Sequence, residues 1–169
     1  MDVKKIIQDQ GLSDFPVGIG GCRNSNSNFD SCGFDIVVFD GKSESDNIIK
    51  IENEFVTIHH ASFSETLSKK LIQYDNLQII QDESWELRMF LSKINQKLPS
   101  LFLDNAKNSL IESLFCCQKT KEAIQNSNVF APCWQKCASF HLADAISSLN
   151  NQRSSPSHML DLLRKLEKN

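Results

Sequence analysis

Two glycines and an aspartate near the N-terminus have the chemistry needed to hold a phosphorylated ligand. Gly20 and Gly21 follow the apolar run at residues 15–19, and Asp35 lies within a second apolar run at residues 34–39. Because glycine has no side chain, the backbone there can approach a triphosphate closely, and nearby N–H groups can bind phosphate oxygens. A carboxylate on an adjacent strand is a ligand that Mg²⁺ prefers. These residues are therefore candidates for nucleotide and metal binding.

The order of these residues resembles the nucleotidyltransferase superfamily related to DNA polymerase β. The signature of that family is a hydrophobic residue, a glycine, a glycine or serine, a polar loop, and two carboxylates separated by one apolar residue. The matching stretches here are Ile19-Gly20-Gly21 and, after eleven intervening residues, Gly33-Phe34-Asp35-Ile36. The motif covers roughly residues 15–60, and the order of the strands extends the resemblance to about residue 82.

The resemblance implies a fold, a reaction and a set of site residues. The fold is a small mixed β-sheet with flanking helices, and the reaction is Mg²⁺-dependent transfer of a nucleoside monophosphate from an NTP to a hydroxyl. Gly20, Gly21 and Arg23 would lie at the triphosphate. Asp35 would bind Mg²⁺, with Asp30 as a further ligand from the loop. In-line phosphoryl transfer needs two such ions, held between carboxylates on one face of a strand.

The acidic part of the signature is incomplete in this sequence. If Asp35 is the second carboxylate of the pair, Gly33 stands where the first is expected. A later strand offers Thr57 and His59 in place of a third carboxylate, with Glu54 only at its edge. A single aspartate is a poor two-metal site. We therefore expect weak or no catalytic activity and a role as a nucleotide-binding or partner-binding module, with an active transferase as the alternative.

The composition bears on partners and compartment. The 18 Lys and Arg against 21 Asp and Glu give a net charge of −3, so a nucleic-acid partner is not expected. The first residues contain no apolar leader segment, and no stretch approaches the roughly 18 apolar residues of a membrane span. We therefore expect a cytoplasmic protein without a membrane partner. In a chain of this length, six cysteines indicate reduced thiols or metal ligands rather than a disulfide scaffold.

The hydrophobic pattern predicts an α+β protein in two parts. Short apolar runs predict strands at 15–19, 34–39, 55–59 and 77–80, and helices at 2–10 and 64–74. Later the apolar period becomes 3.6, which predicts helices from 84 to before Pro99 and at 102–124, about 132–149 and 155–168. We therefore expect a nucleotidyltransferase-like α/β domain at residues 1–82 and an α-helical bundle at residues 83–169.

Cysteine and histidine recur on one stripe of the predicted helix near residue 140. Cys133, Cys137 and His141 are spaced four residues apart. With Cys116 or Cys117 from the preceding helix, they could bind zinc tetrahedrally. The same residues also fit a buried helix face, because free cysteine packs as a small hydrophobe. Packing in the core is the interpretation we favour, and zinc is the alternative.

A last pair of residues lies between the final two predicted helices. The spacing of Arg153 and His158 resembles the Arg-x4–6-His motif of HEPN helical domains. That resemblance implies RNA cleavage, with histidine as general acid/base and arginine stabilising the developing charge. The stretch between them, Ser154-Ser155-Pro156-Ser157, fits a helix cap equally well. The partners that we expect are an NTP and, through the helical half, a protein partner or a second copy of the chain.

Overall fold

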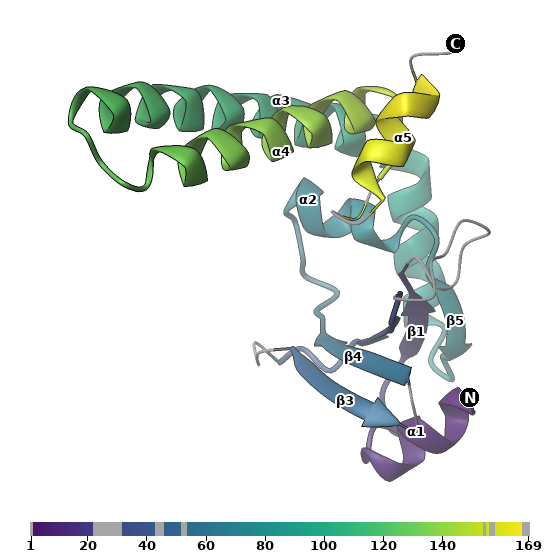
Figure 1. Cartoon of the computed structure of the whole chain (residues 1–169). Helices are drawn as coiled ribbons and strands as arrows, with labels where there is room; N and C mark the ends of the chain where they lie inside the picture. Colours follow the sequence, from purple (N-terminus) through teal and green to yellow (C-terminus); the bar gives the residue numbers. More distant parts are fainter. Residues whose placement is uncertain are drawn as a thin grey trace. The chain divides into compact units, whose positions relative to one another are not determined.

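The computed structural model describes residues 2–21, 32–42, 46–51, 54–153, 155 and 158–166 (Figure 1). A five-stranded mixed sheet and short helices are followed by a long helical C-terminal half, so the α+β class is confirmed. Among the described residues, no helix combines the length and the apolar character needed to cross a membrane.

The sheet has the strand order β3-β4-β2-β1-β5. Its strands are β1 (Val17–Gly20), β2 (Phe34–Val38), β3 (Asn47–Ile51), β4 (Glu54–His60) and β5 (Gln78–Gln81). The central strand β2 runs parallel to β4 and antiparallel to β1, whereas β3 and β5 are edge strands that pair antiparallel with β4 and β1. Central strands read as continuous apolar runs, and Asp35 is the one charged residue of β2.

Helix α1 (Val3–Asp9) packs on one face of this sheet. Asp2 caps the helix by accepting hydrogen bonds from two N–H groups of its first turn. The apolar spacing turns Ile6 and Ile7 inward. They share one core with Leu12, Val17, Ile36, Val38, Val56 and Ile58. Because side chains alternate along a strand, Asp35 lies on the opposite face.

That opposite face carries an aromatic cluster at one end. Phe39 stacks on Phe63 with ring centroids 4.9 Å apart, and Phe90 meets both rings edge-on. Tyr74 lies 5.5 Å from Phe39. Burial raises the pKa of Tyr74 to about 12, so its phenol stays neutral within the cluster.

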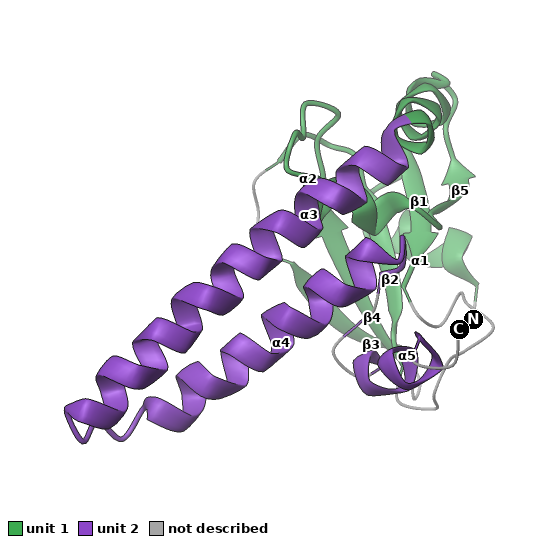
Figure 2. Cartoon of the chain, turned by 90° about the horizontal axis from the view of Figure 1, so that it is seen from above, with its two compact units in different colours: residues 1–96 green, residues 97–169 purple. Residues whose placement is uncertain are grey.

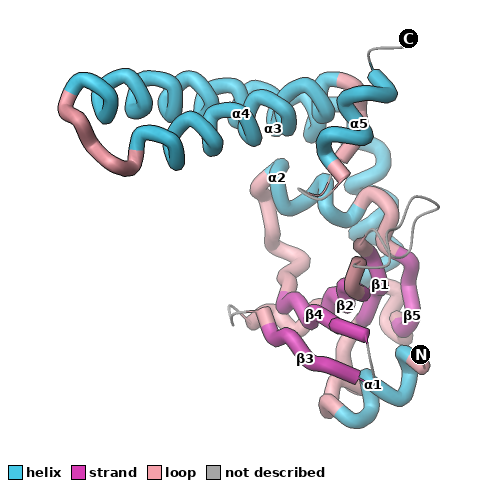
Figure 3. Tube along the Cα trace, viewed as in Figure 1, coloured by secondary structure: helices cyan, strands magenta, loops and turns pink. Residues whose placement is uncertain are grey.

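The helix predicted at residues 64–74 is wrong in its first half. The structure has only α2 (Ser68–Leu71) and the 3₁₀ turn η2 (Ile72–Tyr74) (Figure 3). The Glu65 carboxylate accepts hydrogen bonds from the N–H groups of Thr66 and Leu67, at 2.8 Å each. These local bonds hold the backbone in a turn and delay the helix to Ser68.

The predicted helix break at Pro99 is also wrong. Helix α3 (Glu86–Gln125) continues through Pro99 for 40 residues. Proline removes one backbone hydrogen bond from a helix. Pro99 is exposed, so water can reach the carbonyl that loses its partner. The other backbone hydrogen bonds of this long helix continue it on both sides of Pro99.

The chain divides into two compact units, residues 1–96 and 97–169 (Figure 2). The sequence places the change at residues 82 and 83, where helical periodicity begins. The first turns of α3 nevertheless belong with the sheet, because Leu87 is fully buried and Phe90 joins the aromatic cluster. Asp82 fixes this helix start by accepting hydrogen bonds from the N–H groups of Leu87 and Arg88.

The second unit is built on a helical hairpin of α3 and α4 (Ala131–Leu149), followed by α5 (Met159–Leu166). Small and polar side chains form the seam between α3 and α4. Buried Asn105 donates to Ser148 Oγ at 2.8 Å and to Asp144 Oδ2 at 3.3 Å. Ser109 donates to the same Asp144 oxygen at 2.7 Å. The helices are therefore joined by hydrogen bonds as well as by packing.

Candidate functional site

Strand pairing brings the glycine pair beside Asp35. Gly20 lies opposite Asp35 in the antiparallel ladder of β1 and β2. Thr57 lies opposite Asp35 in the parallel ladder of β2 and β4. Three of the predicted site residues, Gly20, Gly21 and Asp35, are therefore neighbours in the structure, although they come from separate parts of the sequence.

Gly21 makes the closest approach to the aspartate. Its φ is +82°, a conformation that L residues other than glycine rarely adopt. A Cβ at this position would collide with the carboxylate of Asp35. The absence of a side chain therefore lets the Asp35 carboxylate lie directly against the turn after β1.

Gly20 has a packing role in addition to its predicted binding role. A Cβ at Gly20 would lie 3.2 Å from Cδ1 of Leu77, and a Cβ at Gly18 would lie 2.6 Å from Cγ of the same leucine. These distances are shorter than ordinary van der Waals contact. The two glycines thus let Leu77 pack directly on β1.

His59 joins Asp35 from the neighbouring strand. Its Nε2 lies 3.6 Å from Asp35 Oδ1, and its Nδ1 lies 2.9 Å from Oδ1 of Asp46, just before β3. The interaction with Asp35, together with that of Asp46, raises the pKa of His59 above its ordinary value, against the opposing effect of partial burial. The exposed fractions of the Asp35 and His59 side chains are 40% and 35%, so solvent reaches the site.

Asp35, His59 and Asp46 form a row of titratable side chains, called the charged row below, with the histidine between the two carboxylates. When His59 is protonated and both carboxylates are ionised, the row has a net charge of −1; when His59 is neutral, the net charge is −2. Such a row repels a bare polyanion but attracts a cation or an anion that brings its own cation. One oxygen of Asp35, Oδ1, faces His59, while Oδ2 lies towards Gly21.

The backbone leaves little room for a carboxylate at residue 33, where the resembled signature has its first one. A Cβ at Gly33 would lie 2.9 Å from the carbonyl oxygen of Phe55 on β4. An aspartate at residue 33 would need a shift of the strand. The close approach of residue 33 to β4 therefore disfavours the carboxylate pair of the resembled signature.

Two Mg²⁺ ions do not fit the described side chains of this site. Asp35 is its single strand carboxylate, and no group of three or more acidic, histidine or cysteine side chains suited to a metal occurs among the described residues. One Mg²⁺ fits better, because Mg²⁺ is often bound by one carboxylate together with the phosphates of a ligand. The predicted site residues Arg23 and Asp30 lie outside the described residues.

The cysteine–histidine stripe is not in the core. Cys133 and Cys137 are exposed, so the interpretation of these two as buried hydrophobes is wrong. Cys116 is buried, and burial raises the pKa of its thiol. A raised pKa disfavours the thiolate that zinc binds. Cys133 and Cys137 face outward and His141 is half-buried, while smaller side chains such as Ala138 and Ala145 are buried on α4.

The Arg153–His158 pair lies at the start of the last helix. The N–H of His158 donates to the carbonyl of Ser155 at 3.0 Å, and the His158 carbonyl accepts from Leu162 at 3.0 Å. His158 therefore takes part in the first turn of α5, as the cap interpretation expects. An RNA-cleaving role for Arg153 and His158 stays a prediction.

The sequence did not predict that His59 and Asp46 would join Asp35 in the charged row. The alternation of β4 places His59 on the correct face, but only the parallel pairing of β2 and β4 brings it to Asp35. Asp46 gave no signal, because its position depends on β3, a strand that the sequence did not predict.

The sequence matches no protein-family model and no functionally described protein well enough to indicate a relationship.

Proposed function

We propose that this protein is a nucleotidyltransferase-like protein with weak or no transferase activity, which acts as a nucleotide-binding module. The observation that carries the proposal is the contact between the turn at Gly21 and the carboxylate of Asp35. A glycine turn and a strand carboxylate are the parts of the signature that meet the phosphates and their metal ion. Both parts are present, and they are adjacent.

The same geometry argues against efficient catalysis. Phosphoryl transfer relies on metal ions to neutralise the triphosphate and to activate the attacking hydroxyl. Here Gly33 and His59 take places where carboxylates would hold the second ion. The proposed ligand is therefore an NTP with one Mg²⁺, held by Asp35 and by the phosphates themselves. The ion would neutralise negative charge of the phosphates beside the charged row of Asp35, His59 and Asp46.

Calorimetric titration with ATP tests this proposal. Binding is expected with Mg²⁺, and it should weaken in EDTA because ATP alone meets a negative row. Asp35→Ala should weaken the binding of Mg²⁺–ATP in the same way. Asp9→Ala is the matched control, since Asp9 is an exposed carboxylate at the end of α1, and it should leave binding unchanged.

A product assay separates binding from transfer. Incubation of the wild-type chain with labelled NTP, Mg²⁺ and hydroxyl acceptors should release no pyrophosphate above background. Release of pyrophosphate that Asp35→Ala abolishes would instead establish the active transferase. Absence of ATP binding with and without Mg²⁺ would remove both nucleotide functions and leave the protein-binding role of the fold.

A further inference from the structure

The helical hairpin of α3 and α4 has many of its large apolar side chains on the outside. The seam between the helices contains alanine, serine and asparagine, whereas seven large apolar residues of one side are 38–65% exposed. These seven residues, called the apolar face below, are Leu103, Leu110, Leu114, Ile124, Leu142, Ile146 and Leu149. The two helices are therefore held together by small and polar residues. None of the described residues covers the apolar face.

The spacing of these residues is that of helix-to-helix packing. On α3, positions 103, 107, 110, 114, 117, 121 and 124 follow alternating steps of four and three, the heptad pattern of a coiled-coil seam. On α4, positions 139, 142, 146 and 149 follow steps of three, four and three. Each helix thus has a second seam, separate from the one that joins α3 to α4.

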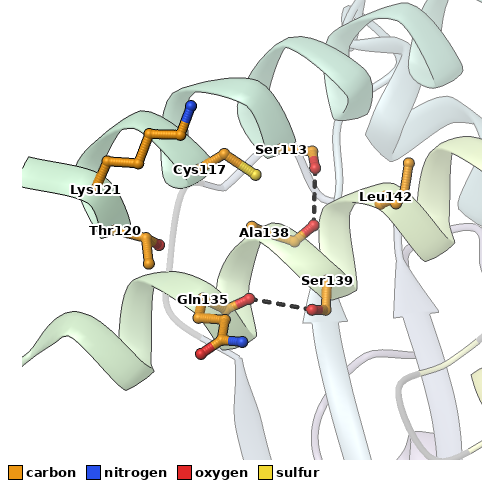
Figure 4. A pocket seen from close by; sticks show the side chains of 8 residues that line it. All are labelled: Ser113, Cys117, Thr120, Lys121, Gln135, Ala138, Ser139 and Leu142. Atoms are coloured by element: carbon orange, nitrogen blue, oxygen red, sulfur yellow. Dashed lines mark hydrogen bonds between the residues drawn. The ribbon is translucent and has the colours of Figure 1, made fainter. Parts of the chain in front are cut away.

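The two seams lie on the same side of the hairpin. A groove of about 300 Å³ runs between the helices and is lined by Cys117 and Lys121 of α3 and by Ser139 and Leu142 of α4 (Figure 4). Cys117 and Lys121 belong to the α3 seam, and Ser139 and Leu142 to the α4 seam. The groove therefore lies between the two seams, beside Leu142 of the apolar face, where it can receive side chains of a partner.

We propose that this apolar face binds the same face of a second copy of the chain, forming a four-helix bundle about a twofold axis. The exposed fractions correspond to on the order of 600 Å² of apolar surface, at the upper limit for the largest patch of a typical monomer. A stable interface buries about 800 Å² of each partner, so the dimer would bury the polar residues between the members of the face as well.

The composition of the face is compatible with a second copy of the chain as its partner. A twofold axis places the face against itself, so its partner is apolar at the same places and has the same two-helix width. Lys107 and Lys121 are the charged residues at its seam positions. Lys107 lies 3.9 Å from Asp104 of its own helix, and long lysine stems can reach solvent at the rim. Neither lysine requires an acidic partner.

Sedimentation of the full chain tests the proposal. The wild type is expected at twice the chain mass of 19.2 kDa. Leu114→Glu and Leu142→Glu should each halve that mass, because a charge would be buried in the interface. Phe140→Glu is the matched control: Phe140 is also an exposed apolar residue of α4, but two residues from Leu142 it points to nearly the opposite side.

Thiol alkylation of the wild type gives a second readout that needs no variant to fold. Cys117 lies in the α3 seam, whereas Cys133 lies nine residues from Leu142 and so on the far side of α4. Both thiols are exposed in the single chain. Raising the protein concentration should slow alkylation of Cys117 by about tenfold or more and leave Cys133 unchanged. A wild type that stays monomeric, or a dimer that survives both glutamate variants with Cys117 still reactive, would overturn the proposal.

Discussion

Replacing Gly21 by alanine tests whether the turn after β1 is shaped around Asp35. The new Cβ has two separate costs. The alanine must adopt φ +82°, a backbone conformation that costs a residue other than glycine about 1 kcal/mol. It must also displace the Asp35 carboxylate, and moving this side chain away from His59 costs about 1 kcal/mol. We therefore expect Gly21→Ala to destabilise the first unit by roughly 2 kcal/mol.

Gly41 supplies the control for the backbone cost. Its φ is +71°, and a Cβ there would meet nothing within 4 Å. Gly41→Ala should therefore lose only the conformational part, about 1 kcal/mol. The difference between the two alanine variants measures the contact with Asp35.

A double-mutant cycle completes the test. In the Asp35→Ala background the carboxylate is absent, so the cost of Gly21→Ala should fall by about 1 kcal/mol to the level of Gly41→Ala. Hydrogen exchange of the slowest amides of β1 and β2 measures the free energy of unfolding for this unit. Equal costs for Gly21→Ala with and without Asp35 would refute the reasoning.

Three further variants probe the charged row, the missing carboxylate and the hairpin seam. Because the pKa of His59 is raised, its ion pairs stabilise the fold fully below about pH 6.5; urea unfolding should show stability falling as pH rises through the folded-state pKa, and His59→Gln should flatten that fall. Gly33→Asp should cost about 1–3 kcal/mol by crowding the carbonyl of Phe55, measured by thermal unfolding, and should yield no transferase activity in the pyrophosphate assay. Asn105→Ala should cost about 1–3 kcal/mol, because buried Asn105 loses both hydrogen bonds and Asp144 loses a donor; calorimetric unfolding would contradict this with a change near zero.

The apolar pattern of the sequence predicted the elements that are buried on a regular period. The run at residues 34–39 and the alternation at 55–59 gave β2 and β4, because their inward residues pack in one core. The sequence did not predict β3. Its residues are half-buried or exposed, so neither face gives a strong apolar signal. The strand forms because it pairs with β4.

The local rules were weaker where tertiary structure overrides them. Proline predicts a helix end, but Pro99 lies inside α3. The Cys133–Cys137 spacing predicts a shared stripe correctly, yet it does not say whether that stripe faces inward. The seam of Asn105, Ser109 and Asp144 settles the orientation of the hairpin, and such polar contacts between distant residues have no periodic signature.

At the charged row, sequence reasoning reached the glycines and Asp35 but not their neighbours. The alternation of β4 placed Thr57 and His59 on the relevant face, in positions where a carboxylate was expected. That His59 would contact Asp35 followed only from the sheet order, in which β4 lies next to β2. The collision that Gly33 avoids is likewise a matter of backbone distance between two strands.

The edge position of β3 links the protonation of His59 to the motion of one strand. Asp46 lies just before β3, which has β4 as its one neighbour in the sheet. An edge strand opens at a lower free energy than the whole fold. An opening of β3 would withdraw Asp46 and so remove its part of the rise in the pKa of His59, while the part due to Asp35 would stay. By reciprocity, a proton on His59 holds β3 closed, and its release above the raised pKa makes the strand easier to open. The pairing of β3 with β4 should therefore be tighter at low pH than at high pH.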